Sequence, residues 1–366
     1  MSRPRTRPRL HRRDFLGTAL ALSGAATAAL LAPSRLWSKP FRSLDPQDAN
    51  IRYGVTGSLW GAWPNGNLRM STDLHEIASD AKRVGLQGIE PYSSQIAEWL
   101  EKPLALYNLC RDSGVALIDV GDLPAAWRPA EQKEVSAAGA ATPNPWIDTE
   151  GNAGLIARMV SFARDFLAPC GCDHWKTNMG SRPQSGPSED QLMRLADTLN
   201  EIGRQTIGYG VRLAPHPHIW GPMEREHEVR TVLARTDPRF VWVTLDTGHL
   251  TLGGMDAVQI VSDYFPRIAE VHLKDTYPRF RGNHSTPTRA EYHRASIYRN
   301  LGAGGVDFPA VLKILRTRNF KGWVVLDLDA PRPNDGTGTI EDNLDANVSY
   351  LRKVLHVKLP APRTKS

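Results

Sequence analysis

Eight short β-rich runs alternate with eight longer amphipathic stretches along most of this 366-residue chain, and this alternation constrains the fold more than any other feature. The predicted strands are 51–58, 86–90, 115–120, 173–179, 210–216, 240–246, 268–273 and 322–328. The predicted helices are 72–85, 93–113, 152–169, 188–208, 225–236, 255–264, 308–319 and 340–355, with Ser71, Ser188 and Asp307 as candidate caps. A strand–helix unit that occurs eight times predicts an α/β fold, the (β/α)8 barrel.

A doubly wound open sheet is the rival fold, but no GxGxxG follows the first predicted strand. We therefore expect a single barrel domain at 50–357 and a tail at 358–366. Two long connections, 121–151 and 274–304, follow the third and seventh strands. In a barrel both lie at the carboxyl ends of the strands, where active sites are found, so they are candidate walls or lids. The alternative for each is a surface insertion.

Residues 1–45 have the features of an export signal and linker rather than of a folded domain. A basic stretch ends in the pair Arg12-Arg13, and an apolar run rich in Ala and Gly follows at 15–32. This order is typical of a twin-arginine signal peptide. The alternative is a transmembrane anchor, but the run is marginal against the ~20 apolar residues that a span needs. We expect a periplasmic or otherwise exported bacterial protein with no stable membrane association after signal cleavage.

The charge distribution argues against a nucleic-acid partner. The net charge is +6, and residues 1–50 hold nine Lys/Arg against three acidic residues, so the rest of the chain is neutral. A duplex-binding surface needs a basic face, for which this body has no surplus. Cys110, Cys170 and Cys172 form no disulfide framework or CxxC pair, and we expect them to be packing residues.

Ionisable side chains recur in or just after the predicted strands. They are Glu90, His174, Lys176, His216, His218, Asp246, His249, His272, Lys274, Asp275, Asp327 and Asp329. Barrel geometry points the ends of all strands toward one place, so carboxylates and imidazoles should converge there. Such a mixed oxygen and nitrogen set, without Cys, suits one divalent ion such as Mn²⁺, Co²⁺, Mg²⁺ or Zn²⁺. The alternative is a set of buried salt bridges.

Five motifs make the chain resemble the xylose-isomerase-like TIM-barrel superfamily, which includes sugar isomerases and epimerases, inosose dehydratases and endonuclease IV. The motifs are HPH at 216–218, LDTGHL at 245–250, VHLKD at 271–275, GAGGVDF at 302–308 and GWVVLDLD at 322–329. The resemblance covers about residues 50–357. It implies one divalent metal held by side chains from strands five to eight.

The resemblance also implies a role for individual residues. The implied metal ligands are His218 (with His216 as the alternate), Asp246, His272 and Asp327, and the implied catalytic or pocket-lining residues are His249, Glu90, Lys176 and Lys274. There are two departures from the family pattern. Strand five has His where sugar epimerases have Glu, which is closer to the inosose-dehydratase branch. Strand eight has Asp327 where Glu is usual, so the two-glutamate mechanism of the epimerases does not transfer intact.

The chemistry that follows is proton abstraction next to a carbonyl of a free sugar or sugar derivative, assisted by the metal. His249, His218 and Glu90 are the candidate bases, and Lys176 or Lys274 could supply a proton or bind an oxyanion. The leading interpretation is an isomerase or epimerase. The first alternative is a lyase or dehydratase acting on a keto-sugar, inosose or 3-keto-glycoside.

Two further interpretations differ in class. A non-catalytic, exported sugar-binding protein is suggested by Asp327 in place of Glu. A DNA-repair nuclease of the same fold is opposed by the neutral body and the export signal. The expected partner is a small carbohydrate substrate, and the sequence is compatible with a homo-oligomer.

Overall fold

The computed structural model describes residues 48, 50–64, 67–127, 143–332 and 338–361. The predicted signal at 1–45, part of the connection 121–151 and part of the tail lie outside these residues. Among the helices in the described ranges, none is both long and apolar enough to cross a membrane.

All eight predicted barrel strands are present. They are β1 (Ile51–Thr56), β4 (Gly88–Glu90), β5 (Ala116–Leu117), β6 (His174–Thr177), β7 (Arg212–Pro215), β8 (Val243–Asp246), β9 (Ile268–Leu273) and β12 (Gly322–Leu326). Six of them pair in parallel in the order β5-β4-β1-β12-β9-β8, and β6 pairs in parallel with β7. A parallel bridge between Leu213 and Val241 joins β7 to the segment just before β8. The indole of Trp175 donates to the carbonyl of Val120 at 2.9 Å, linking β6 to the segment after β5. The predicted parallel α/β barrel is confirmed.

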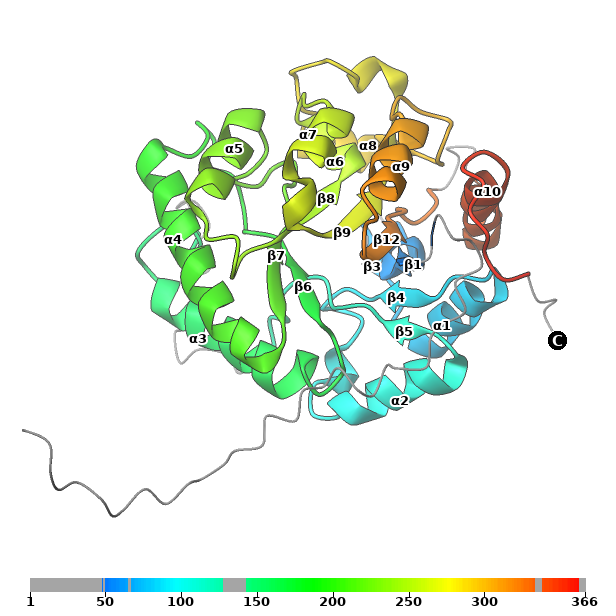
Figure 1. Ribbon diagram of the computed structural model, residues 1–366, viewed down its shortest axis with the longest axis horizontal. Coiled ribbons are helices and arrows are strands. Elements are labelled where there is room, and N and C mark those ends of the chain that lie inside the picture. Colours follow the sequence, from blue (N-terminus) through cyan, green and yellow to red (C-terminus); the bar gives the residue numbers. More distant parts are fainter. Residues whose placement is uncertain (1–47, 49, 65–66, 128–142, 333–337, 362–366) are drawn as a thin grey trace, which may run out of the picture. The chain divides into compact units, whose positions relative to one another are not determined.

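Helices cover the outside of the strands, and Figure 1 shows α3, α4 and α5 on one side with α1 and α2 on another. The helices are α1 (Leu74–Arg83), α2 (Pro103–Ser113), α3 (Asn152–Phe162), α4 (Glu189–Thr206), α5 (Glu226–Arg235), α6 (Thr247–Leu252), α7 (Ala257–Tyr264), α9 (Phe308–Thr317) and α10 (Ile340–Lys353). Ser188 and Asp307 cap α4 and α9 as predicted. The prediction for Ser71 is wrong, because α1 begins later and the Asp73 carboxylate accepts its first amide protons.

Strand register brings the predicted polar residues together. Asp246 at the end of β8 pairs with His272 in β9. The amide of Asp327, directly after β12, donates to the carbonyl of Leu273 at 3.1 Å. Because neighbouring parallel strands end at the same level, these three side chains meet at the carboxyl end of the barrel.

The connection 274–304 forms a small structure of its own beside these strand ends. It contains β10 (Asp275–Thr276) and β11 (Tyr298–Arg299), which pair antiparallel, and the short helix α8 (Arg289–Arg294). Phe280, Ile297 and Tyr298 pack with Ile219 and Leu252, which follow β7 and β8. The connection therefore forms a wall that is anchored by its own apolar cluster. A second small pair, β2 (Gly61–Ala62) and β3 (Arg69–Met70), follows β1.

The three cysteines are buried and free, as expected for packing residues. The Cys170 thiol lies 3.3 Å from the carbonyl of Pro103. Burial raises the pKa of the Cys110 thiol to about 12, so it is inert as a nucleophile at neutral pH.

Candidate metal and substrate site

Four side chains from neighbouring strands converge at the carboxyl end of the barrel. They are His216, Asp246, His272 and Asp327, each at most 2% exposed. His272 Nδ1 lies 3.7 Å from Asp246 Oδ2 and 3.4 Å from Asp327 Oδ2, and His216 Nε2 lies 3.9 Å from Asp246 Oδ2. Asp246 Oδ2 thus faces an imidazole nitrogen on each side, and it belongs to two ligand groups, one with His216 and His249 and one with His272 and Asp327.

The chemistry of this group fits a divalent cation. His216 Nε2 and Asp246 Oδ2 are buried, yet make no hydrogen bond to any of the described residues. Buried polar atoms rarely lack a partner, and a mixed nitrogen and oxygen set is one that Zn²⁺ or Mn²⁺ accepts. The shorter Asp327 side chain still reaches His272, so replacing Glu with Asp does not take this residue out of the group.

His218 lies beside this group rather than among its closest atoms. The sets of metal-ligating atoms within 4.8 Å of one another, among the described residues, include His216 and omit His218. His218 Nδ1 donates to the carbonyl of Ile219, and its ring lies 3.6 Å, centre to centre, from the ring of His249. The sequence predicted His218 as the metal ligand with His216 as the alternate. β7 ends at Pro215, before both residues, so strand alternation does not decide between them.

Three neutral imidazoles line one side of the site. Burial and the neighbouring histidines hold the pKa of His249 well below its usual range. Burial and His216 lower the pKa of His218 to about 3. Burial and the Lys176 charge hold the pKa of His216 well below its usual range. All three rings are therefore unprotonated at neutral pH and can accept a proton or ligate a metal.

His249 has a hydroxyl partner from the wall formed by 274–304. The Tyr298 hydroxyl lies 3.3 Å from His249 Nδ1, and the backbone amide of His249 donates to Asp246 Oδ1 at 2.7 Å. The second contact caps α6 and fixes the start of the helix that carries His249. Burial and the Asp327 charge raise the pKa of Asp246 to about 6.

Lys274 is held in the site by two carboxylates. Its Nζ donates to Asp327 Oδ1 at 3.0 Å and to Asp329 Oδ1 at 2.9 Å. Burial opposes ionisation of Asp327, but Lys274 and His272 outweigh burial and hold its pKa well below the usual range. Thr56 and Ser58 add hydroxyl donors to Asp327 Oδ1 at 3.2 and 3.3 Å. Asp327 is therefore an ionised carboxylate at all physiological pH values.

The wall formed by 274–304 also contacts Asp329, one of the two carboxylates that bind Lys274. The Tyr292 hydroxyl of α8 donates to Asp329 Oδ2 at 2.7 Å. The Arg332 guanidinium stacks 3.4 Å from the ring centre of Trp63 and 4.9 Å from that of Tyr292. The Trp220 indole donates to the carbonyl of Pro287 at 2.7 Å. These contacts hold α8 and the residues just before it against segments that follow β2, β7 and β12.

Glu90 and Lys176 lie on the Nε2 side of His272, and both are fully buried. Lys176 Nζ lies 3.1 Å from Glu90 Oε1, and Glu90 Oε2 lies 2.9 Å from His272 Nε2. Burial opposes protonation of Lys176, but Glu90 and the other acidic groups around it, Asp122 and Asp119 among them, together outweigh burial and hold its pKa well above the usual range. The pair thus brings one positive and one negative charge to the barrel interior.

A third ionic group, which sequence reasoning did not single out as a unit, lies deeper in the barrel. His174 is held between Asp173 at 2.6 Å and Glu270 at 3.2 Å, and Asp119 is its near neighbour. Burial alone would lower the pKa of His174, but its hydrogen bonds to Asp173 and Glu270 raise it to about 10. Both ring nitrogens of His174 are hydrogen-bonded to carboxylates, Nδ1 to Asp173 and Nε2 to Glu270, so neither is left to ligate a metal and this group is a structural ion cluster.

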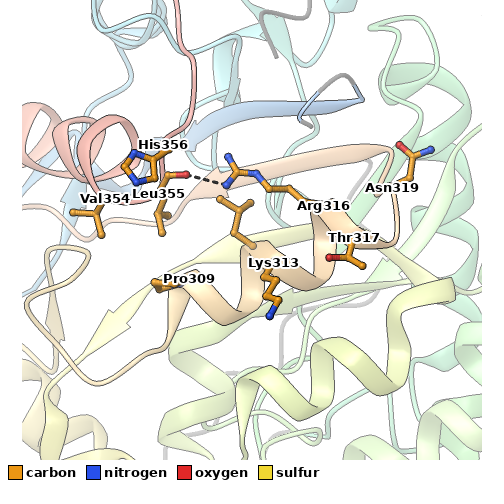
Figure 2. Close-up of a pocket in the computed structure, with 9 residues that line it drawn as sticks. Pro309, Lys313, Arg316, Thr317, Asn319, Val354, Leu355 and His356 are labelled. Carbon is orange, nitrogen blue, oxygen red and sulfur yellow. Dashed lines mark hydrogen bonds between the residues drawn. The ribbon is translucent and has the colours of Figure 1, made fainter. Parts of the chain in front are cut away.

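A separate hollow lies on the outside of the barrel helices. Figure 2 shows it between α9 and the residues after α10, with a volume of about 640 Å³. Lys313 and Arg316 of α9 line it together with Val354, Leu355 and His356. The Arg316 guanidinium donates to the Leu355 carbonyl at 3.0 Å, the contact drawn in Figure 2. None of the strand-end residues described above lines this hollow.

A parallel α/β barrel with a buried imidazole–carboxylate group at its strand ends defines the class of protein. The sequence matches the family described as "Xylose isomerase-like TIM barrel" over residues 78–354, and the chain belongs to that family.

Curated relatives match part of the chain. An inosose dehydratase from Clostridium botulinum (strain Alaska E43 / Type E3) is 29% identical over 144 residues, which is 39% of this chain and 48% of that protein. An inosose dehydratase from Salmonella typhimurium is 29% identical over 150 residues, or 40% and 49%. The chain thus spans about half the length of the curated relatives that it matches.

Solved structures match nearly the whole fold. A sugar phosphate isomerase/epimerase from Parabacteroides distasonis gives a TM-score of 0.60 at 15% identity, over 87% of this chain and 99% of that one. The IOLI protein with a bound zinc atom gives 0.60 at 14% identity, over 83% and 98%. At these identities the likeness shows the fold alone.

Proposed function

We propose that this protein is a divalent-metal-dependent enzyme that removes a proton next to a carbonyl of a carbohydrate substrate. The observation that carries the proposal is the pair of buried ligand groups that share Asp246, one with His216 and His249 and one with His272 and Asp327, with His216 Nε2 and Asp246 Oδ2 left without a hydrogen bond among the described residues. We assign His216, Asp246, His272 and Asp327 as the metal ligands. When bound, a divalent ion would polarise the substrate carbonyl and offset the negative charge that develops on its oxygen.

His249 is the base in this proposal. It is a neutral imidazole in the site, and a neutral imidazole can take a proton from carbon. Tyr298 holds the ring through its Nδ1 contact, and the Asp246 cap holds its backbone. Lys274, fixed by Asp327 and Asp329, keeps an ammonium in the site that can bind an oxyanion or return a proton.

After the proton next to the carbonyl has been removed, we favour elimination of water from the substrate. It is supported by the inosose dehydratases among the relatives and by His216 in place of the strand-five Glu of epimerases. The bond from the α-carbon to hydrogen breaks, the electron pair forms the new double bond, and the β-hydroxyl leaves as water after protonation. Isomerisation or epimerisation is the second candidate, and the Lys274 ammonium beside Asp327 favours it because it can return a proton to the same substrate.

The test is incubation of the full chain in D₂O with inososes, keto-sugars, 3-keto-glycosides and free sugars, with and without EDTA, followed by mass spectrometry. A product lighter by one water, formed only without EDTA, supports a dehydratase. Solvent deuterium in an intact skeleton supports an isomerase or epimerase. His249→Ala should abolish either signal, whereas the exposed His227→Ala should not. Metal-loaded protein that exchanges no proton on any of these substrates would contradict the proposal.

We also propose that the protein is exported through the twin-arginine pathway, on the basis of residues 1–45. Cell fractionation of the wild type and of an Arg12→Lys/Arg13→Lys variant tests this. Periplasmic wild type with cytoplasmic variant is expected, and identical distributions would contradict it.

A further inference from the structure

His272 has two ring nitrogens with different surroundings. Nδ1 faces the carboxylates of Asp246 and Asp327, at 3.7 and 3.4 Å. Nε2 points into the barrel, where Glu90 Oε2 lies at 2.9 Å and Glu270 Oε1 at 3.6 Å. His272 is entirely buried, so solvent cannot decide which nitrogen carries the proton.

Among the described residues, His272 Nε2 and both oxygens of Glu90 are buried and make no hydrogen bond, and Glu90 Oε2 at 2.9 Å is the closest carboxylate oxygen to Nε2. Glu270 is already committed, because its second oxygen accepts from His174 at 3.2 Å. Glu90 is therefore the nearest acceptor for an Nε2 proton, and Lys176 Nζ lies 3.1 Å from its other oxygen.

A second metal below His272 is the competing interpretation, because ligand atoms of Glu90, Glu270 and His272 lie within 4.8 Å of one another. Charge argues against it. The Glu90 and Glu270 carboxylates are already balanced by the Lys176 ammonium and the His174 imidazolium. A further divalent ion would add two uncompensated positive charges to a fully buried place.

We propose that Glu90 is a positioning residue, which holds the proton of His272 on Nε2 and so leaves Nδ1 as the metal-binding nitrogen. This inference rests on the proposed function, since it assigns His272 as a ligand. A metal-bound imidazole generally donates its other N–H to a carboxylate, carbonyl or water, and loss of that partner costs about 10–100-fold in metal affinity. Glu90 thus acts on the metal through His272 and does not need to touch the substrate.

The first measurement is long-range ¹H–¹⁵N NMR on the zinc-loaded full chain. We expect the His272 pattern of a ring that is metallated at Nδ1 and protonated at Nε2, with slow exchange of the Nε2 proton because the site is buried. In Glu90→Ala this proton should exchange quickly or the pattern should change. Glu90→Gln should retain it, because the amide oxygen can still accept a hydrogen bond.

The second measurement is zinc affinity by competition with a chromophoric chelator. We expect about 10–100-fold weaker binding for Glu90→Ala and near wild-type binding for Glu90→Gln. Glu270→Gln is the matched control, because it neutralises the second carboxylate near the same nitrogen, and its affinity should change less than that of Glu90→Ala.

Glu90→Ala leaves the Lys176 ammonium without its partner, and the variant can fail to fold for that reason. The double variant Glu90→Ala/Lys176→Met, compared with Lys176→Met alone, removes both charges and keeps the test valid. Equal zinc affinity and equal NMR patterns in this pair, or a loss caused by Glu270→Gln and not by Glu90→Ala, would overturn the proposal. Absence of zinc binding to the wild type would instead contradict the proposed function.

Discussion

The ion cluster around His174 predicts how the free energy of unfolding depends on pH. His174 is 0% exposed and is held between Asp173 and Glu270 at 2.6 and 3.2 Å. Its hydrogen bonds to these carboxylates outweigh burial and raise its pKa from 6.5 to about 10. The difference, at 1.36 kcal/mol per pH unit, corresponds to about 5 kcal/mol of folding free energy.

The pH dependence follows from the direction of this shift. The folded protein binds the His174 proton more tightly than the unfolded chain does, so the stabilisation is complete below about pH 6.5 and is lost as the pH rises through about 10. His174→Gln removes the charge, and its stability deficit relative to the wild type should be about 3–5 kcal/mol near pH 6.5. The deficit should shrink by roughly 3–4 kcal/mol between pH 7 and pH 10.

Urea unfolding of the metal-free wild type and of His174→Gln, followed at pH 6.5, 8 and 10, measures this deficit directly. His227→Gln is the control, because that histidine is on the surface, and its deficit should stay within about 0.5 kcal/mol at each pH. A His174→Gln deficit that is the same at pH 6.5 and pH 10 would refute the assignment of a buried imidazolium.

Three further predictions concern the metal and substrate site. Asp327→Asn removes a ligand charge and should weaken zinc binding at least about tenfold by isothermal titration calorimetry; an unchanged Kd would exclude Asp327 as a ligand. Tyr292→Phe removes the 2.7 Å hydrogen bond to Asp329, worth about 1–3 kcal/mol, so limited proteolysis should cut the α8 segment faster; identical cleavage rates would show that this bond does not hold α8. Tyr298→Phe removes the hydroxyl beside His249, so the pH profile of substrate proton exchange should shift while folding is retained; superimposable profiles would dissociate Tyr298 from the base.

The barrel could be predicted from the sequence because its signals are local. The strand at 268–273 and the helix at 308–317 each carry their own pattern of apolar residues, and Asp307 caps the helix as its position in the chain suggests. The meeting of Asp246, His272 and Asp327 also followed from the chain, because every barrel strand brings its carboxyl end to the same place.

Other parts of the site depend on packing that a single sequence does not encode locally. His216 and His218 are two residues apart, and only the path of the chain after β7 separates the ring near Asp246 from the ring near His249. Glu270 and His174 each place an ionisable side chain inside a predicted strand, but nothing in the sequence indicates that they pair with each other. Tyr292 lies in a polar insertion, where nothing in the sequence indicates its contact with Asp329.

The central claim is that one divalent ion binds to His216, Asp246, His272 and Asp327. Zinc titration of the wild type, His216→Ala and His218→Ala, each confirmed as folded by circular dichroism, tests it most directly. The account predicts one tightly bound zinc per chain in the wild type and in His218→Ala, with binding lost or greatly weakened in His216→Ala. No zinc binding in the wild type, or loss of binding in His218→Ala with retention in His216→Ala, would contradict it.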